Sequence, residues 1–299
     1  MARRLLSHLL ITLAVLSLTA TFFVWVIDAT VLNPVQLTKA LHDGGVPSAL
    51  ANVIPEQATK DIKNNDNGNT SGNNKVAEAA DMKAKIAAVI TPTYVESKLQ
   101  TITATIINFM KKGSPQPTLD ISDFPTKLRA SGIAVGSDLD KNFSAPIQLN
   151  EKGSLDALPK AYSKFKLAKY IGVGLFIVLL TAEWFVAEKN QKLKRIGRIF
   201  LHAGIWYTLW WLVITVVPSR ALPKLKDSLR VDASTNTLID AVARSMQHLF
   251  SQYFLAFAIT CWVLAALFYL SRHVRKHVDA IQRVPPATAR QLATIKRIK

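Results

Sequence analysis

The sequence predicts a mainly α-helical membrane protein with four transmembrane helices and a mostly helical extracytoplasmic domain between the first and second spans. Of its 299 residues, 49% are apolar, and they are grouped in long runs rather than spread along the chain. The mean hydropathy of +0.19 is high for a water-soluble domain. Between the first two apolar runs, residues 28–166 carry 16 Lys/Arg and 14 Asp/Glu, so this long segment is close to neutral.

The formal net charge of +17 comes mainly from three segments that lie beside apolar runs. Residues 1–4, 188–198 and 271–299 together hold 15 of the 37 Lys and Arg residues. Short basic segments next to apolar spans stay in the cytoplasm, where their cations contact anionic lipid. We therefore expect both termini in the cytoplasm, an anionic inner leaflet as a partner, and no nucleic acid. The expected headgroup contacts are Arg3, Arg4, Lys189, Lys192, Lys194, Arg195, Arg272, Arg275 and Lys276.

The first apolar run, Leu5 to Ile27, is long enough to cross a hydrocarbon core of about 30 Å. We expect an uncleaved anchor, because the bulky residues Phe22 to Trp25 stand where a signal peptide needs small ones. Residues 1–27 are thus a cytoplasmic stub and the first span. The remaining expected segments are spans at 167–187, 199–218 and 249–270, a basic cytoplasmic loop at 188–198 and a basic cytoplasmic tail at 271–299.

Residues 28–166 carry repeated helix signals. Asn33-Pro34 and Thr91-Pro92 each combine a capping side chain with a proline at the first helical position. Further helices are expected from Pro47 to Ile62, with Pro55 kinking or splitting the helix, and from Val76 to Ile90. The other expected features are a mobile Asn/Gly-rich loop at 64–75, and short strands at 118–121 and 146–149 that pair as a small antiparallel ribbon around a short helix at 123–131. Two short extracytoplasmic helices are expected within 219–248.

The helix that begins after Thr91 has the clearest apolar stripe outside the spans. Its members recur at helical spacing: Val95, Leu99, Ile102, Ile106, Phe109 and Met110. One interpretation is that the stripe packs against the helices of residues 34–62. The other is that part of it forms an apolar ligand groove or a partner surface.

Candidate chemistry in the spans centres on Glu183, an ionisable residue near the inner end of the second span. Such a residue suggests proton or ion handling by default. Its position near Arg198 and His202 favours instead a structural polar contact or simple snorkelling to the membrane surface. The chain has a single cysteine, Cys261, and contains no catalytic motif such as HExxH, GxSxG or a Walker-type loop. We expect no enzyme activity, no cofactor and no metal site.

Four stretches carry a resemblance to known proteins: TVLNP at 30–34, ITPTYVESKL at 90–99, TLDISDF at 118–124 and LKRIGRIFLHAGI at 193–205. The chain resembles a group of uncharacterised bacterial four-span membrane proteins with a helical extracytoplasmic domain. This resemblance implies fold and topology and brings no activity with it. The layout of one span, a large outer domain and three spans is also similar to mechanotransmitting ABC permeases, whose loop between spans two and three lies near an ATPase.

Together these patterns predict an integral plasma-membrane protein that presents a helical extracytoplasmic domain for binding or assembly at the cell envelope, without catalysis. The expected partner is then an envelope protein. The alternatives are a permease-like subunit with a separate cytoplasmic ATPase, and an ion- or proton-coupled carrier. The sequence does not indicate the oligomeric state.

Overall fold

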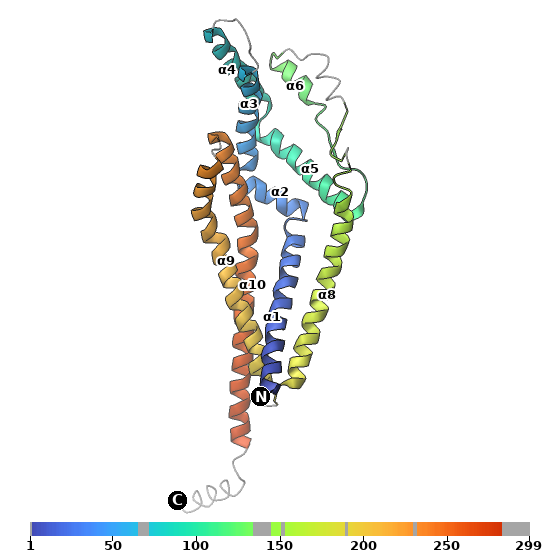
Figure 1. The fold of residues 1–299 in the computed structure, drawn as a ribbon, viewed down its shortest axis with the longest axis vertical. Helices are drawn as coiled ribbons and strands as arrows, with labels where there is room; N and C mark the ends of the chain where they lie inside the picture. The colour runs from blue at the N-terminus through green and yellow to red at the C-terminus, as the bar shows by residue number, and fades with distance from the viewer. Residues whose placement is uncertain are drawn as a thin grey trace, which may run out of the picture. The chain divides into compact units, whose positions relative to one another are not determined.

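The part of the chain that the structure describes is mainly helical, and four of its helices are long and apolar enough to cross a membrane. The computed structural model describes residues 2–64, 72–133, 145–150, 153–188, 191–229 and 232–282. The candidate spans lie at Leu5–Ala29, Ala157–Val186, Lys192–Lys224 and Ala233–Arg275. Figure 1 shows the helices that carry them, which are α1 (Ala2–Ala29), α8 (Ala157–Val186), α9 (Lys192–Leu229) and α10 (Ala233–Gln282).

The chain divides into two compact units, each assembled from separate stretches. The first unit comprises Met1–Phe22, Tyr170–Trp210 and Phe254–Lys299, and holds much of the four long apolar helices. The second unit comprises Phe23–Lys169 and Trp211–Tyr253. It contains the shorter elements α2 (Pro34–Asp43), α3 (Val46–Asn64), α4 (Gly72–Val89), α5 (Pro92–Lys112), β1 (Thr118–Leu119), α6 (Phe124–Ala130) and β2 (Ile147–Gln148).

In the first unit, three helices meet at a small apolar core. Ile11 and Ala14 of α1 contact Leu179 of α8 and Ile199 of α9. Gly172 lets α1 and α8 approach closely: Ser17 Oγ donates a hydrogen bond to its carbonyl oxygen at 3.1 Å. A Cβ at Gly172 would collide with the Thr21 side chain, whereas one at Gly174 would meet no atom within 4 Å. Of the two glycines in this span, only Gly172 is therefore required for close helix packing.

An aromatic cluster forms a second contact among α1, α9 and α10 in the same unit. The Phe22 ring lies edge-on to Tyr207 and Phe254, with centroid distances of 4.8 and 5.1 Å, and stacks on Phe257 at 4.2 Å. Phe22, Tyr207 and Phe254 are all buried. Edge-on and stacked rings contribute about 0.5–1.5 kcal/mol per pair beyond the burial of their area.

In the second unit, the predicted caps begin the predicted helices. The Asn33 side chain accepts from the backbone N–H groups of Val35 and Gln36, and the Thr91 hydroxyl accepts from Tyr94 N. Gly113 ends α5 in the left-handed conformation, with φ of 76°. Pro55 lies inside α3 without splitting it. Strands β1 and β2 pair antiparallel in the register Thr118↔Gln148, which confirms the predicted ribbon around a short helix.

Two cores stabilise the second unit. In one, Val46 and Ala49 of α3 pack on Ala241 of α10, with Leu41, Leu50, Leu99 and Leu238 around them. In the other, Ala51 of α3 packs with Ile90, which precedes α5, and with Val95 near the start of α5. Leu50 and Leu99 belong to both cores, so α3 and α5 are held together along one continuous apolar seam.

The third span was predicted to end at Pro218, but helix α9 continues through Pro218 and Pro223 to Leu229. A proline inside a helix has no N–H and disturbs the carbonyl groups of the preceding turn. One carbonyl of that turn, Thr215 O, accepts a hydrogen bond from Gln247 Nε2 of α10 at 3.2 Å. Lys226 of α9 also forms an ion pair with Asp240 of α10. Contacts with α10 thus support the helix beyond its prolines.

Some expected segments fall partly outside the described residues. Of the predicted loop at 64–75, residues 65–71 lie outside them, and Gly72 already begins α4. Of the basic loop at 188–198, positions 189–190 lie outside them, and α9 begins at Lys192. The basic tail is helical up to Gln282, and positions 283–299 lie outside the described residues.

Candidate functional site

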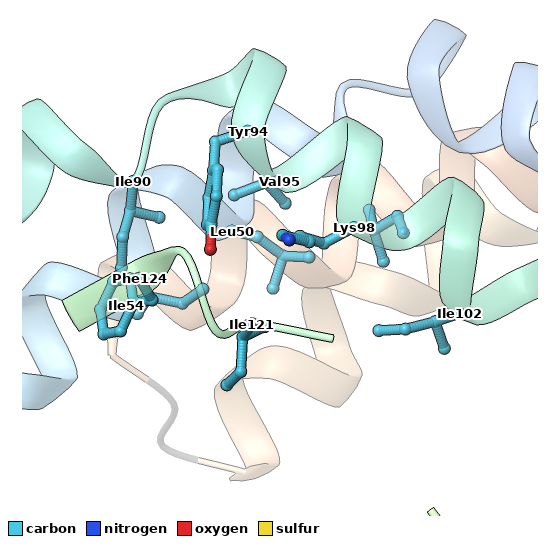
Figure 2. Close-up of a pocket in the computed structure, with 10 residues that line it drawn as sticks. Leu50, Ile54, Ile90, Tyr94, Val95, Lys98, Ile102, Ile121 and Phe124 are labelled. Carbon is cyan, nitrogen blue, oxygen red and sulfur yellow. The ribbon is translucent and has the colours of Figure 1, made fainter. Parts of the chain in front are cut away.

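The candidate functional site is an apolar pocket of about 290 Å³ in the second unit. A volume near 300 Å³ is at the lower end of the range for small-molecule pockets. Figure 2 shows side chains from α3, α5 and the segment after β1 converging on this space. The lining residues are Leu50, Ile54, Ile90, Tyr94, Val95, Lys98, Leu99, Ile102, Ile121 and Phe124.

Local sequence places these side chains on one face of each element. Thr91 caps α5 and Pro92 occupies its first turn, which fixes where the helix begins. Tyr94, Lys98 and Ile102 then follow at intervals of four residues and therefore share a face. Leu50 and Ile54 are likewise four residues apart on α3. The pocket is thus the gap left where two helical faces meet beside the β1–α6 connection.

Asp123 is the centre of a polar network at the edge of the pocket. Its Oδ1 accepts from Lys98 Nζ at 2.9 Å and from the Tyr94 hydroxyl at 3.2 Å. Its Oδ2 lies 3.1 Å from Lys127 Nζ, which also sits 4.2 Å from the centre of the Tyr94 ring. Lys98 Nζ additionally donates to Asp120 O at 2.7 Å. These bonds tie the 120–127 segment to α5 and hold one side of the pocket in place.

The network also sets the protonation of its members. Burial, followed by the nearby charge of Asp123, raises the pKa of Tyr94 well above its ordinary value, so the phenol stays neutral. Burial alone would raise the pKa of Asp123, but the hydrogen bonds from Lys98 and Lys127 outweigh it and lower that pKa. The backbone and side-chain hydrogen bonds from Ser122 lower the pKa of Asp120. The edge therefore carries paired charges around a neutral phenol.

This arrangement is suited to holding an apolar group. Eight of the ten lining side chains are aliphatic or Phe, and the polar atoms of Tyr94 and Lys98 are already engaged by Asp123. A ligand gains free energy here by removing apolar surface from water, at about 25 cal/mol per Å². The two Lys and two Asp residues at the edge leave the opening without a strong net charge.

Sequence reasoning found part of this site. The predicted stripe of α5 supplies Val95, Leu99 and Ile102 to the pocket. Its other members lie further along the helix and do not line the pocket: Ile106, Phe109 and Met110. It missed Tyr94, Lys98 and Phe124. The available signal was the pair Tyr94 and Lys98, four residues apart and each next to a stripe residue. Their partner Asp123 lies 25 residues beyond Lys98, which no local pattern links to α5.

In the first unit, Glu183 is fully buried and accepts hydrogen bonds from Ser7 and Arg195. Ser7 Oγ donates to Glu183 Oε1 at 2.6 Å, and Arg195 Nη1 donates to the same oxygen at 3.3 Å. Glu183 Oε2 is buried and makes no hydrogen bond to the described residues. We expected Arg195 at lipid headgroups, but its side chain is only 9% exposed because it pairs with this carboxylate.

Arg198 and His202, the expected neighbours of Glu183, line a separate cavity between α1 and α9. Of the other predicted headgroup cations, Lys192 lies 4.9 Å from the centre of the Trp184 ring, and Arg275 is exposed. Lys194 and Arg272 are half-buried. Arg272 Nε is buried and makes no hydrogen bond to the described residues. The side chains of Arg3, Arg4 and Lys276, and all of Lys189, lie outside what the structure describes.

Within the described residues, no group of three His, Cys, Asp or Glu side chains is placed to hold a metal ion. Comparison with known proteins gives no match: no family model, no curated protein and no solved structure is similar to this chain. Functional inference therefore depends on the geometry of the chain itself.

Proposed function

We propose that this chain is a plasma-membrane protein whose extracytoplasmic helical domain binds an apolar chain or side chain at the cell envelope, without catalysing a reaction. The observation that carries the proposal is the pocket between α3 and α5. Four helices long and apolar enough to cross a membrane support the placement of the protein in one.

The distribution of basic residues supports the sidedness. The segments 1–4, 188–198 and 271–299 would all lie on one side of a four-span chain, and short basic segments of this kind stay in the cytoplasm. Residues 28–166 and 219–248 are then extracytoplasmic. Long segments cross the membrane largely regardless of charge, so the 16 Lys/Arg of 28–166 do not oppose this topology.

The chemistry of the pocket supports binding over catalysis. Its walls are apolar, and its two polar lining residues, Tyr94 and Lys98, are occupied by Asp123. A nucleophile or general base would need a reactive group that faces substrate and can exchange a proton near neutral pH. Tyr94 has a raised pKa, which keeps its phenol protonated at neutral pH.

The test is photolabelling of the full chain in lipid nanodiscs with a diazirine-bearing decanol, an uncharged probe with one apolar chain. Labelled peptides are identified by mass spectrometry. Labels are expected on residues 50–54 and 90–102, the two stretches that supply most of the pocket wall. Ile54→Trp should fill the pocket and abolish these labels.

Asn108→Trp is the matched control, because Asn108 is exposed on α5 and does not line the pocket. It should leave the labelling pattern unchanged. Labels confined to the four apolar helices, or labels on 50–54 that persist in Ile54→Trp, would contradict the proposal.

The carrier alternative rests on Glu183, whose ion pair with the buried Arg195 supports a structural role instead. A permease-like subunit remains the second candidate, supported by the layout of spans and by the basic residues of 188–198. Co-purification of a stoichiometric ATPase with the full chain would favour it over a protein that acts alone.

A further inference from the structure

The first unit contains a cavity of about 600 Å³ between α1 and α9 that the proposed function does not use. It belongs to that unit alone, since its lining residues all come from stretches 8–19 and 198–206. They are His8, Ile11, Thr12, Val15, Leu16, Thr19, Arg198, His202 and Trp206.

The lining of the cavity changes along the two helices from charged and polar side chains to mainly apolar ones. His8 on α1, and Arg198 and His202 on α9, lie toward the N-terminal ends of their helices. Val15, Leu16 and Trp206 lie further along. From His8 to Thr19 the cavity extends roughly 16 Å at 1.5 Å per residue. This is about half of a hydrocarbon core of about 30 Å, the depth of one leaflet.

The charge at the polar end is of one sign. The lining contains Arg198 and two histidines, and no carboxylate. The buried carboxylate of the same unit, Glu183, is already paired with Arg195. Arg198 therefore presents a permanent positive charge to whatever occupies the cavity, since a guanidinium stays protonated in proteins.

The orientation of His202 adds a second polar group. Its Nδ1 lies 2.7 Å from the carbonyl oxygen of Arg198, one helical turn earlier. A carbonyl oxygen can only accept a hydrogen bond, so Nδ1 must carry the hydrogen. The ring is thereby fixed, and in the neutral ring Nε2 is a hydrogen-bond acceptor, which suits a hydroxyl group of a ligand and not a phosphate oxygen.

We propose that this cavity binds one anionic phospholipid. Its phosphate lies at Arg198, the hydroxyl groups of its headgroup lie beside His202 and His8, and one acyl chain lies along Ile11, Val15 and Leu16. Basic pockets between transmembrane helices are known to favour such headgroups. An apolar helix of a second copy would fill the same groove but would leave Arg198 without a counter-charge beside hydrocarbon, which is costly. The proposal does not depend on the ligand of the second unit.

The experiment measures lipid retention by native mass spectrometry on the full chain in detergent, titrated with phosphatidylglycerol or phosphatidylcholine. The wild type should retain one phosphatidylglycerol and lose phosphatidylcholine. Removing one cation near the headgroup, as in Arg198→Gln, should weaken phosphatidylglycerol binding about fivefold. Arg198→Lys should bind more tightly than Arg198→Gln because it restores the charge.

Two further variants separate the headgroup from the chain. Leu16→Trp should abolish retention by blocking the apolar part, while every cation stays in place. Arg275→Gln removes an exposed cation of α10 that does not line the cavity, and should leave the retention of phosphatidylglycerol unchanged. Thermal unfolding of each variant checks that it is folded.

Three outcomes would overturn the proposal. Equal weakening by Arg275→Gln would mean general attraction to a basic surface. Equal affinity for glycerophosphoglycerol, which has the headgroup but no acyl chains, would mean a free-phosphate site. A dimer that excludes phosphatidylglycerol and dissociates in Leu16→Trp would mean that a second copy fills the groove.

Discussion

Arg195 Nη1 lies 3.3 Å from Glu183 Oε1, and this ion pair is buried among apolar helices. Removing one partner of a buried pair leaves an uncompensated charge, whereas replacing both with apolar residues is often nearly neutral. Comparing a single with a double substitution of this pair therefore separates the cost of an unpaired buried charge from the net contribution of the pair to stability.

We expect Arg195→Met to lower the free energy of unfolding by about 3–5 kcal/mol, because Glu183 would stay buried without its counter-ion. The double variant Arg195→Met with Glu183→Met should recover most of this loss. Denaturant unfolding in a single detergent, followed by circular dichroism, measures both. Lys192→Met, at the start of the same helix, is the control and should shift the midpoint little. A loss in Arg195→Met no larger than in Lys192→Met would refute a stabilising pair.

Gly44 marks a close contact between α2 and α10 in the second unit. A Cβ at this position would collide with the Ser245 hydroxyl and lie 2.7 Å from Ala241 O. Gly44→Ala should therefore destabilise the protein by about 1–3 kcal/mol through overpacking. Gly174→Ala is the comparison, because a Cβ there meets no atom within 4 Å, and it should be neutral or slightly stabilising. Thermal melting points that fall equally in both variants would argue against the contact.

Asp123 should make the second unit sensitive to acid. Burial alone would raise its pKa, but the bonds from Lys98 and Lys127 lower it below the ordinary 3.8. A carboxyl with a lowered pKa in the folded state stabilises that state above its unfolded pKa. This contribution is lost as the pH falls below about 4 and through the folded value.

Asp123→Asn should therefore be less stable at pH 7, and should lose less on acidification to pH 3, than the wild type. Unfolding midpoints measured across this range test the expectation. Lys98→Met should flatten the acid profile in the same direction, because it removes one of the donors to Asp123. Parallel pH profiles for wild type and Asp123→Asn would show that the network does not contribute.

The proposed topology predicts opposite accessibility for two lysine positions. In a Cys261→Ala background, Lys111→Cys on α5 should react with a membrane-impermeant maleimide added outside intact cells. Lys192→Cys at the start of α9 should react only after permeabilisation. Mass-shift gels measure both. Labelling of position 192 from outside would mean that the chain has the opposite orientation in the membrane.

The helix starts and the two short strands could be predicted because their causes are local. Asn33-Pro34 and Thr91-Pro92 contain both the cap and the restricted backbone that begin a helix. The strands around 118 and 147 alternate in a short window next to turn residues. The capping contacts and the alternation within each strand lie within a few residues, whereas the pairing of Thr118 with Gln148 joins two such local signals across 30 positions.

What could not be predicted depends on partners distant in the chain. The continuation of α9 past Pro218 is supported by Gln247, 32 residues from its acceptor Thr215. The burial of Arg195 depends on Glu183, which itself bonds Ser7, 176 residues away. Periodicity indicates that a residue faces a neighbour but does not identify that neighbour.

The order of the pocket residues along the chain has a consequence for biosynthesis. Its walls come from Leu50 to Phe124, so they are complete in sequence before α8 is synthesised. Contacts close in sequence form first, and chains fold from the N-terminus as they emerge. Ala241, which packs on Val46 and Ala49, arrives more than a hundred residues later. We therefore expect a nascent chain to expose the apolar face of α3 that carries Val46 and Ala49 until α10 has been synthesised. That face is where a chaperone of the assembling protein would bind.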